Sequence, residues 1–232
     1  MSPVSPREQE EAARSLYPML VNLAGKRCVV IGGGAVAERK VSRLLECGAE
    51  VSLVSPTATA RLAGLAQAGR IARQARPARP ADLEGAFLVF VATDDPELNR
   101  TLAQAARGQG SLVNVADDPA GSSFHVPSLV QRGDLTITIS TRGGSPALAK
   151  KLRQRLEATI GPEYEAFLVA LRALRAQAQE RFADPAARQT LYRLAVESDL
   201  FENAAAGRTD AVAARIEALV RAAAQPETEL RK

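Results

Sequence analysis

The feature that most constrains the fold is a glycine triplet, Gly32 to Gly34, which lies between an apolar run and a helix-like segment. Residues 28–31 before it have the continuous apolar character of a strand that is buried on both faces. After it, apolar residues recur at the spacing of one face of an α-helix. The triplet therefore predicts a strand, a tight turn and a helix.

In this context Gly32, Gly34 and Ala37 match the dinucleotide-binding fingerprint G-x-G-x-x-A. Gly32 would permit the turn, Gly34 would let the backbone approach a pyrophosphate, and Ala37 would let the helix pack close to the strand. The helix N-terminus would offer free N–H groups and its positive dipole end to the phosphates. The alternative is a glycine-rich turn that only packs a helix onto a sheet.

The chain then alternates between strand-like and helix-like segments. We expect strands at 49–54, 70–74, 87–92 and 112–116, and helices at 59–68 and 96–107. Such alternation predicts an α/β fold with a Rossmann-like, doubly wound parallel sheet. Ligands of such sheets bind outside the carboxyl ends of the strands.

The character of the sequence changes at Asp117, where a loop rich in hydroxyl and turn residues begins. The segments 129–131 and 135–140 can pair as a β-hairpin. Ser145 is then expected to cap a helix over 146–160, with Pro146 in its first turn. This helix start is a second place where backbone amides and a dipole could meet an anion.

The rest of the chain predicts helices at 163–182, 185–197 and 210–224, and residues 1–15 are polar and predict a mobile tail. An apolar stripe of Leu168, Leu171, Leu174 and Ala178 could pack on a second copy of the chain or on its own N-terminal domain.

Composition narrows the class of partner. Only 4% of the residues are aromatic and Trp is absent, which argues against a base-stacking nucleic-acid surface despite the net charge of +4. No segment has the length and apolarity of a membrane span or a secretory leader. Cys28 and Cys47 lack the spacing of a metal site and are expected to be buried, reduced thiols. A cytoplasmic protein without a membrane or nucleic-acid partner is predicted.

The expected cofactor-binding residues follow the predicted strands: Gly32, Gly33, Gly34, Ala35, Val36, Ser55, Pro56, Thr57, Thr93 and Asp94. Ser55 stands where NAD sites usually have an acidic residue for the ribose. Backbone groups or the Ser55 and Thr57 hydroxyls would have to replace it. Because no arginine immediately follows to favour a 2′-phosphate, NAD is expected rather than NADP.

Several motifs together resemble the siroheme synthase module, over roughly residues 16–200. They are Tyr17-Pro18, GGGAVAERK at 32–40, ATDDPELN at 92–99, NVADDP at 114–119, FHVPS at 124–128 and STRGGSPALAKKLR at 140–153. The resemblance implies an NAD-dependent oxidation of precorrin-2 to sirohydrochlorin, with ferrous iron as the substrate of a possible second step that gives siroheme. It also implies a homodimer that holds the tetrapyrrole in a cleft between domains.

The resulting division of the chain is a tail at 1–15, an NAD-binding Rossmann domain at 16–118, a small α+β dimerisation and substrate region at 119–160, and a C-terminal helical domain at 161–232.

The resemblance also assigns site residues. Asp117 matches the aspartate that the family uses as a base, and the alternative is that it only caps the turn at Asp118-Pro119. His125, the single histidine, could relay a proton or could be a packed loop residue. No resident metal site is expected. The expected substrate-binding residues are Asn114, Ser123, His125, Arg142, Gly143, Gly144 and Ser145.

A rival hypothesis is a regulatory, NAD-sensing Rossmann module of the kind attached to potassium transporters, without catalysis. It would explain the glycine triplet. It would not explain the motifs within 114–128 and 140–153.

Overall fold

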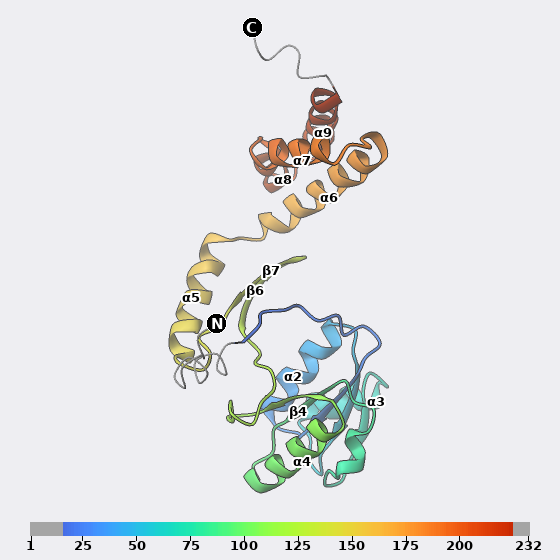
Figure 1. The fold of residues 1–232 in the computed structure, drawn as a ribbon, viewed down its shortest axis with the longest axis vertical. Helices are drawn as coiled ribbons and strands as arrows, with labels where there is room; N and C mark the ends of the chain where they lie inside the picture. The colour runs from blue at the N-terminus through green and yellow to red at the C-terminus, as the bar shows by residue number, and fades with distance from the viewer. Residues whose placement is uncertain (1–15, 225–232) are drawn as a thin grey trace, which may run out of the picture. The chain divides into compact units, whose positions relative to one another are not determined.

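The computed structural model describes residues 16–224, and its contacts divide the chain into two units, Met1–Val126 and Pro127–Lys232 (Figure 1). Each unit is described by itself. The mobile tail predicted for residues 1–15 lies outside the described residues. The predicted boundaries at residues 118 and 160 stay predictions.

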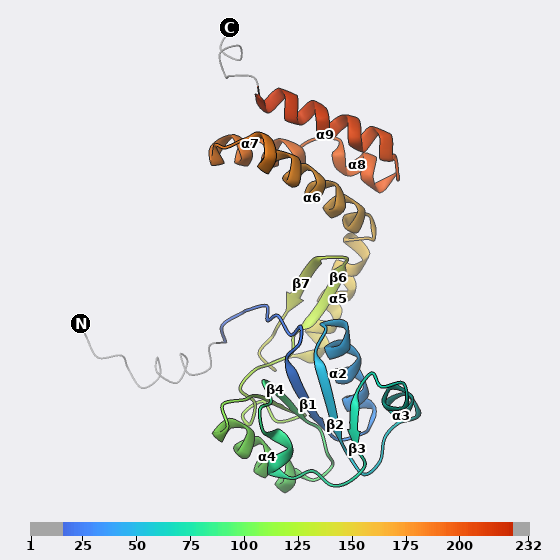
Figure 2. The ribbon, with the colours of Figure 1, turned by 90° about the vertical axis from the view of Figure 1, so that its right-hand side faces the viewer.

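The first unit is built on a five-stranded parallel sheet with the order β3-β2-β1-β4-β5 (Figure 2). Its strands are β1 (Arg27–Ile31), β2 (Glu50–Val54), β3 (Ala72–Gln74), β4 (Leu88–Val91) and β5 (Leu112–Val115). Every residue of β4 is buried, as expected for a strand covered on both faces. The predicted Rossmann-like parallel sheet is confirmed.

Helices cover both faces of this sheet. On one face, α2 (Ala35–Glu46) and α3 (Ala60–Gln67) pack on a core that includes Val30 and Phe90. On the other, α4 (Pro96–Gly108) and the 3₁₀ turn η1 (Pro80–Leu83) pack on a second core. Ala37 is fully buried between α2 and the sheet, which confirms the close helix packing predicted from the fingerprint.

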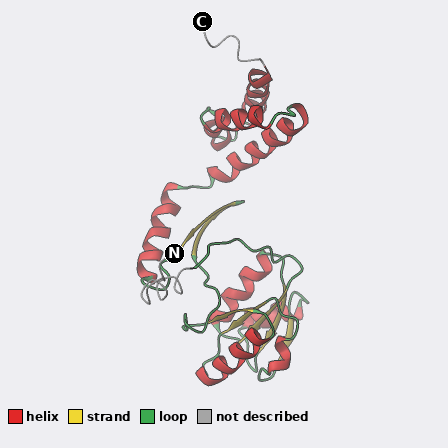
Figure 3. Ribbon diagram, viewed as in Figure 1, coloured by secondary structure: helices red, strands yellow, loops and turns green. Residues whose placement is uncertain are grey.

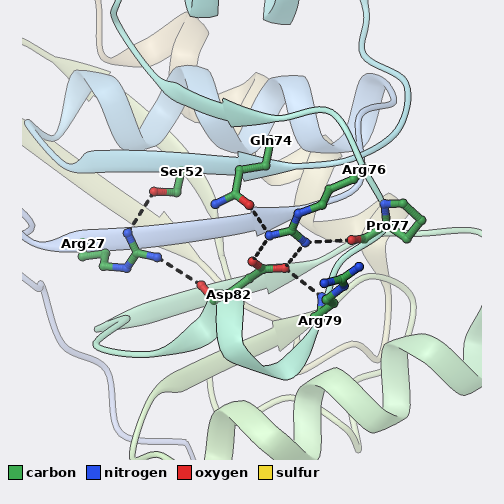
Figure 4. Close-up of polar contacts among 7 residues, drawn as sticks. All are labelled: Arg27, Ser52, Gln74, Arg76, Pro77, Arg79 and Asp82. Atoms are coloured by element: carbon green, nitrogen blue, oxygen red, sulfur yellow. Dashed lines mark hydrogen bonds and ion pairs between the residues drawn. The ribbon is translucent and has the colours of Figure 1, made fainter.

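A polar cluster fastens the loop that joins β3 to β4 (Figure 4). Arg76 donates from Nη1 and Nη2 to the two carboxylate oxygens of Asp82, at 2.8 and 2.5 Å, and also donates to Gln74. The Arg79 N–H donates to Asp82 Oδ2 at 2.8 Å. Arg27 reaches the same turn and donates to the Asp82 carbonyl at 3.0 Å. The Arg76 guanidinium holds the pKa of the buried Asp82 carboxyl below its usual range.

The second unit begins with an antiparallel hairpin of β6 (Ser128–Arg132) and β7 (Leu135–Ile139), and the rest of its described part is helical (Figure 3). The helices are α5 (Pro146–Thr159), α6 (Glu163–Arg181), α7 (Pro185–Val196), α8 (Leu200–Ala205) and α9 (Thr209–Ala224). The prediction missed α8, because six residues are too few to reveal a helical period.

The predicted apolar stripe of α6 was wrong in one place. The buried residues are Phe167, Ala170, Leu174 and Ala178, whereas Leu168 lies outside this core. Phe167 packs edge-on against Phe201 of α8, with ring centroids 5.3 Å apart. The stripe is therefore buried among α6, α7, α8 and α9, and needs neither a second copy nor the first unit to cover it.

The two cysteines differ in their surroundings. Both are free, and burial raises the pKa of the Cys28 thiol to about 11. Cys47 is exposed at the C-terminal end of α2, so the expectation that it is buried was wrong. Among the helices of residues 16–224, none combines the length and apolarity needed to cross a membrane.

Candidate functional site

The site lies at the carboxyl edge of the parallel sheet in the first unit. Parallel strands end on the same side, so the segments that follow β2, β1, β4 and β5 form one continuous edge. These segments carry the predicted cofactor-binding residues, at 55–57, 32–36 and 93–94, and the predicted base, Asp117. The topology therefore brings together side chains that are up to about 80 positions apart in the chain.

Each glycine of the triplet has a different environment. Gly32 has a φ of +108°, and a Cβ added there would collide with the carbonyl of Ala92 at the end of β4. A Cβ on Gly33 would collide with the Thr57 carbonyl after β2. Gly34 is exposed, and a Cβ there would meet nothing within 4 Å. Two glycines thus let the turn pack between neighbouring strand ends, and the third leaves its outer side open.

The N-terminus of α2 has no side-chain cap. Gly34 occupies the N-cap position and has no side chain with which to cap the helix. By contrast, the Asp95 carboxylate caps α4 by accepting from two backbone N–H groups. Ala35 is exposed and Val36 is half-buried in the first turn. An uncapped helix start beside an open glycine is the environment that a pyrophosphate requires, so the residues present fit a dinucleotide.

The segment after β2 packs tightly against the glycine turn. Ser55 is 5% exposed and its N–H donates to the Gln74 carbonyl at 3.1 Å, while Pro56 and Thr57 are exposed. Thr57 is therefore better placed than Ser55 to offer a hydroxyl to a ligand. Arg73 of β3 donates from Nη2 to the Pro56 carbonyl at 3.4 Å. No pattern in the sequence points to this arginine, because only the pairing of β3 with β2 brings it there.

The two predicted residues after β4 have different roles. The Thr93 hydroxyl donates to Asn99 Oδ1 at 2.6 Å, and Asn99 returns a bond from Nδ2 to the Thr93 carbonyl at 2.9 Å. These bonds attach the strand end to α4. Asp94 is exposed and makes no hydrogen bond or ion pair with any described residue. Of the pair, Asp94 is the one whose polar atoms are available.

Asp117 follows β5 with a φ of +59°, a left-handed conformation that few residues other than glycine and asparagine or aspartate adopt readily. Its carboxylate is exposed and has no partner among the described residues. The neighbouring Asp118 instead accepts from the Gly121 N–H at 2.8 Å. Asp118 is therefore the turn cap, and the Asp117 carboxylate remains free at the strand end.

The segment 122–125 is hydrogen-bonded to β5. The Ser123 hydroxyl accepts from the Val113 N–H at 2.7 Å, and Asn114 donates from Nδ2 to the Phe124 carbonyl at 3.0 Å. Both predicted substrate residues thus hold the backbone of this segment in place. His125 is half-buried and follows directly. Contact of Asn114, Ser123 and His125 with a substrate stays a prediction.

The predicted residues of the second unit form a compact turn before α5. Arg142 has a φ of +51°, its N–H donates to Ser140 Oγ at 3.2 Å, and the Gly144 N–H donates to the Thr141 carbonyl at 2.8 Å. Ser145 caps α5 by accepting from the Leu148 N–H at 3.2 Å, as predicted. Gly143 lies between them with a φ of +83°. That this turn meets the edge of the sheet stays a prediction.

Within residues 16–224, no three histidine, cysteine or acidic side chains gather closely enough to hold a metal ion.

Comparison with known proteins identifies two matching family models. Residues 19–128 match a model described as "Putative NAD(P)-binding", and residues 132–159 match one described as "Sirohaem biosynthesis protein central". The first match covers the whole edge described above.

Curated relatives include siroheme synthases. The chain is 36% identical over 192 residues to "Siroheme synthase" of Stutzerimonas stutzeri, an alignment that covers 83% of this chain and 41% of the relative. It is 39% identical over 182 residues to "Siroheme synthase 1" of Aeromonas salmonicida, covering 78% of this chain and 39% of the relative. The chain thus spans about two fifths of the length of these relatives.

A solved structure titled "SirC, precorrin-2 dehydrogenase" has the same fold. It matches with a TM-score of 0.74 at 24% identity, covering 87% of this chain and 99% of the other. The two family models follow one another along the chain, and the glycine turn and the sheet lie within the first of them. The chain therefore corresponds to the N-terminal module of the siroheme synthases, an NAD(P)-binding domain followed by the central domain of that family.

Proposed function

We propose that this protein oxidises precorrin-2 to sirohydrochlorin with NAD. The observation that carries the proposal is that one sheet edge combines an open dinucleotide-binding turn with a free carboxylate at Asp117. Only β4 separates β1 from β5, so Asp117 stands about 10 Å along the edge from the glycine turn at ordinary strand spacing. A dinucleotide whose pyrophosphate lies at Gly34 can extend its nicotinamide over this distance.

The residues at this edge divide the work of binding. The open side of Gly34 and the N-terminus of α2 hold the pyrophosphate, and Thr57 with the backbone at Pro56 offers hydrogen bonds to the adenosine ribose. Bound NAD supplies a hydride acceptor. We propose NAD rather than NADP because no arginine directly follows Ser55 in the chain to favour a 2′-phosphate. Arg73, which donates to the Pro56 carbonyl, is the nearby arginine that tests this choice. Tighter binding of NADP than of NAD, reversed in Arg73→Ala, would overturn this choice.

Asp117 acts as the base of the reaction. A precorrin-2 carbon that loses a hydride leaves a cationic macrocycle, which becomes neutral when an adjacent position releases a proton. An exposed carboxylate without a protein partner can accept that proton. The backbone at Asp117 is left-handed, and the Asp118 cap holds the turn that carries it.

The same carboxylate suits a second step. Insertion of ferrous iron, a substrate here, into sirohydrochlorin requires removal of two pyrrole protons, so Asp117 can serve again. His125 lies on the segment that Asn114 attaches to β5 and could relay these protons. The absence of the second step would leave a dehydrogenase only.

A homodimer completes the proposal. The β6–β7 hairpin has two strands, a size that needs further packing to be stable, and α5 of its own unit packs against it. Leu135, Ile137 and Ile139 of β7 are only half-buried. A second copy of the hairpin could cover this apolar strand. Ile137→Glu should then convert a dimer into a monomer in analytical ultracentrifugation, and an unchanged mass would contradict this role.

The experiment that tests the function mixes the purified protein with precorrin-2 and NAD under anaerobic conditions. Formation of NADH together with the sirohydrochlorin spectrum supports the dehydrogenase, and later addition of ferrous iron tests the second step. NAD binding without any oxidation of the tetrapyrrole would overturn the proposal and favour the NAD-sensing module instead.

A further inference from the structure

A lysine whose charge has no protein partner lies close to the proposed site. Lys40, on the second turn of α2, places its Nζ 5.0 Å from the centroid of the Phe90 ring. Phe90 is 5% exposed in β4, and the Phe124 ring packs edge-on against it, 5.5 Å away at an angle of 72°. An ammonium over an aromatic face is attracted by the ring quadrupole, so the two phenylalanines fix where Lys40 lies.

This group is near the carboxyl edge of the sheet. Phe90 is paired in register with Asn114 of β5, and each is the last residue but one of its strand. Asn114 in turn donates to the Phe124 carbonyl at 3.0 Å, next to His125. Lys40 therefore belongs to the same part of the first unit as Asp117 and His125, although it precedes them by more than 70 residues.

The charge of Lys40 is uncompensated. Its side chain is half-buried, and burial together with the nearby Arg39 lowers its pKa. The carboxylate of the adjacent Glu38 accepts from Thr59 Oγ1 at 2.5 Å and lies 4.0 Å from Arg61. No hydrogen bond or ion pair to Lys40 occurs among the described residues, and an aromatic ring satisfies none of its three N–H donors. The ammonium of a half-buried lysine that has no anionic partner in the protein keeps its N–H donors available to water or to a ligand.

A second lysine of the same unit provides the comparison. Lys26 lies 5.8 Å from the centroid of Phe87, but it is exposed and lies just before β1, at the opposite end of the sheet. It is therefore a surface cation–π contact surrounded by water. Lys40 makes the same kind of contact in a half-buried position near the end where ligands of such sheets bind.

We propose that Lys40 is a substrate-binding residue whose ammonium pairs with a side-chain carboxylate of the tetrapyrrole. This rests on the proposed function, because the chemistry that would recognise Lys40 is a polycarboxylate and precorrin-2 carries eight carboxylates. The aromatic pair holds the ammonium in position, and partial burial strengthens its attraction to an anion. The interaction is present in both the ground state and the transition state, so it affects substrate affinity more than the rate of the chemical step.

The test compares Lys40→Met with the wild type, and uses Lys26→Met as the matched control. Met retains the apolar stem over the ring and removes the charge. Lys40→Met should raise the KM for precorrin-2 and the Kd for sirohydrochlorin by about 10-fold or more, the effect typical of losing one charge-assisted bond. The Kd for NAD, measured by calorimetry, should stay unchanged. Lys26→Met should change none of these constants.

Further variants keep the result interpretable. Lys40→Arg should restore tetrapyrrole affinity to within about threefold, because it retains the charge at the same face. The salt dependence of the sirohydrochlorin Kd should be weaker in Lys40→Met and Lys40→Gln than in the wild type. Each variant's thermal unfolding is recorded, and if Lys40→Met does not fold, Lys40→Gln and Lys40→Arg decide the question.

Three results would overturn the inference. Equal tetrapyrrole affinity in the wild type and the charge-removing variants would leave Lys40 as a packing residue. A weakened Kd for NAD instead would assign Lys40 to the cofactor. A wild-type protein that binds NAD but no tetrapyrrole would defeat the proposed function itself, and is distinguishable because it requires no variant.

Discussion

Two polar regions of the first unit are built from similar residues and differ in whether those residues have partners. In the cluster that fastens the β3–β4 loop, the Asp82 carboxylate accepts from Arg76 and Arg79 and is buried (Figure 4). At the carboxyl edge, Asp94 and Asp117 are exposed and have no partner among the described residues. The N-terminus of α2 at that edge also lacks a side-chain cap.

The difference separates stability from ligand binding. A carboxylate satisfied by arginine and backbone donors contributes to folding and has little capacity left for a ligand. The unpartnered groups at the edge of the sheet retain their hydrogen-bonding capacity and add little to stability. The apolar cores on both faces of the sheet supply the stability instead. We therefore expect substitutions of the open or unpartnered groups at the edge to change affinity or turnover while the unfolding free energy stays the same. Substitutions in the cluster should do the reverse.

The largest effect is expected at Gly34. Gly34→Asp places a carboxylate against the pyrophosphate, so the Kd for NAD should rise by about 100-fold or more through like-charge repulsion. The unfolding free energy should be nearly unchanged, because a Cβ at Gly34 meets nothing and an acidic group suits a helix N-terminus. Calorimetry and urea unfolding measure both quantities. Retained NAD affinity would show that the turn only packs α2 onto the sheet.

Gly33→Ala is the matched control for the same turn. Its Cβ would collide with the Thr57 carbonyl, so this variant should lower the unfolding free energy. A Gly33→Ala protein as stable as the wild type would contradict the difference drawn between Gly32 and Gly33, which are needed for packing, and Gly34, which is open.

The next effect is expected in the polar cluster. Asp82→Asn should lower the unfolding free energy by about 2 kcal/mol, because it removes the charge that accepts from Arg76 within a buried turn. The Kd for NAD should not change, since the cluster lies in the loop between β3 and β4 and outside the glycine turn. Urea unfolding at constant pH measures the loss. A variant that binds NAD more weakly at full stability would contradict the separation.

The same pair predicts how stability depends on pH. The folded-state pKa of Asp82 is depressed, so its contribution is present above the unfolded-state pKa of about 4 and is lost as the pH falls through the lower folded-state value. The difference in unfolding free energy between the wild type and Asp82→Asn should stay constant above about pH 5 and shrink below about pH 4. A difference that does not depend on pH would exclude the ion pair as its source.

A smaller effect is expected at the start of α5, where Ser145 already caps the helix. Ser145→Ala should lower the unfolding free energy of the second unit by about 1 kcal/mol, the usual value for a lost N-cap. The Kd for NAD should stay the same, because the Ser145 hydroxyl bonds to the backbone of its own helix and is not one of the predicted cofactor-binding residues. Far-ultraviolet circular dichroism during urea unfolding follows the helices, and an unchanged midpoint would contradict the assigned cap.

Local chemistry explains what could be predicted from the sequence. The glycine turn, the caps at Asp95 and Ser145, and the parallel sheet all follow from patterns within a few residues or from repeated alternation. The sequence left open whether Asp117 only caps the turn at Asp118-Pro119, and in the structure it is Asp118 that accepts the capping hydrogen bond.

Side-chain contacts between residues that only the pairing of strands or the packing of helices brings together could not be predicted from the sequence. Arg73 reaches Pro56 only through the register of β3 with β2, and Lys40 meets Phe90 only because α2 packs on the core to which Phe90 belongs. The Ser123 hydroxyl accepts a hydrogen bond from the Val113 N–H of β5, and the residues next to Ser123 in the sequence give no sign of this bond. The buried face of α6 includes Phe167 in place of Leu168, because α8 supplies Phe201 opposite it.

The most direct test of the central claim replaces the free carboxylate and retains its backbone. Asp117→Asn is the suitable variant, because asparagine tolerates the left-handed φ that alanine would strain, and Asp118→Asn is its neighbour and control. We expect Asp117→Asn to lower the kcat of NAD-dependent precorrin-2 oxidation by about 100-fold or more with an unchanged Kd for NAD, and Asp118→Asn to keep its kcat. An Asp117→Asn protein that oxidises precorrin-2 at the wild-type rate would contradict the account.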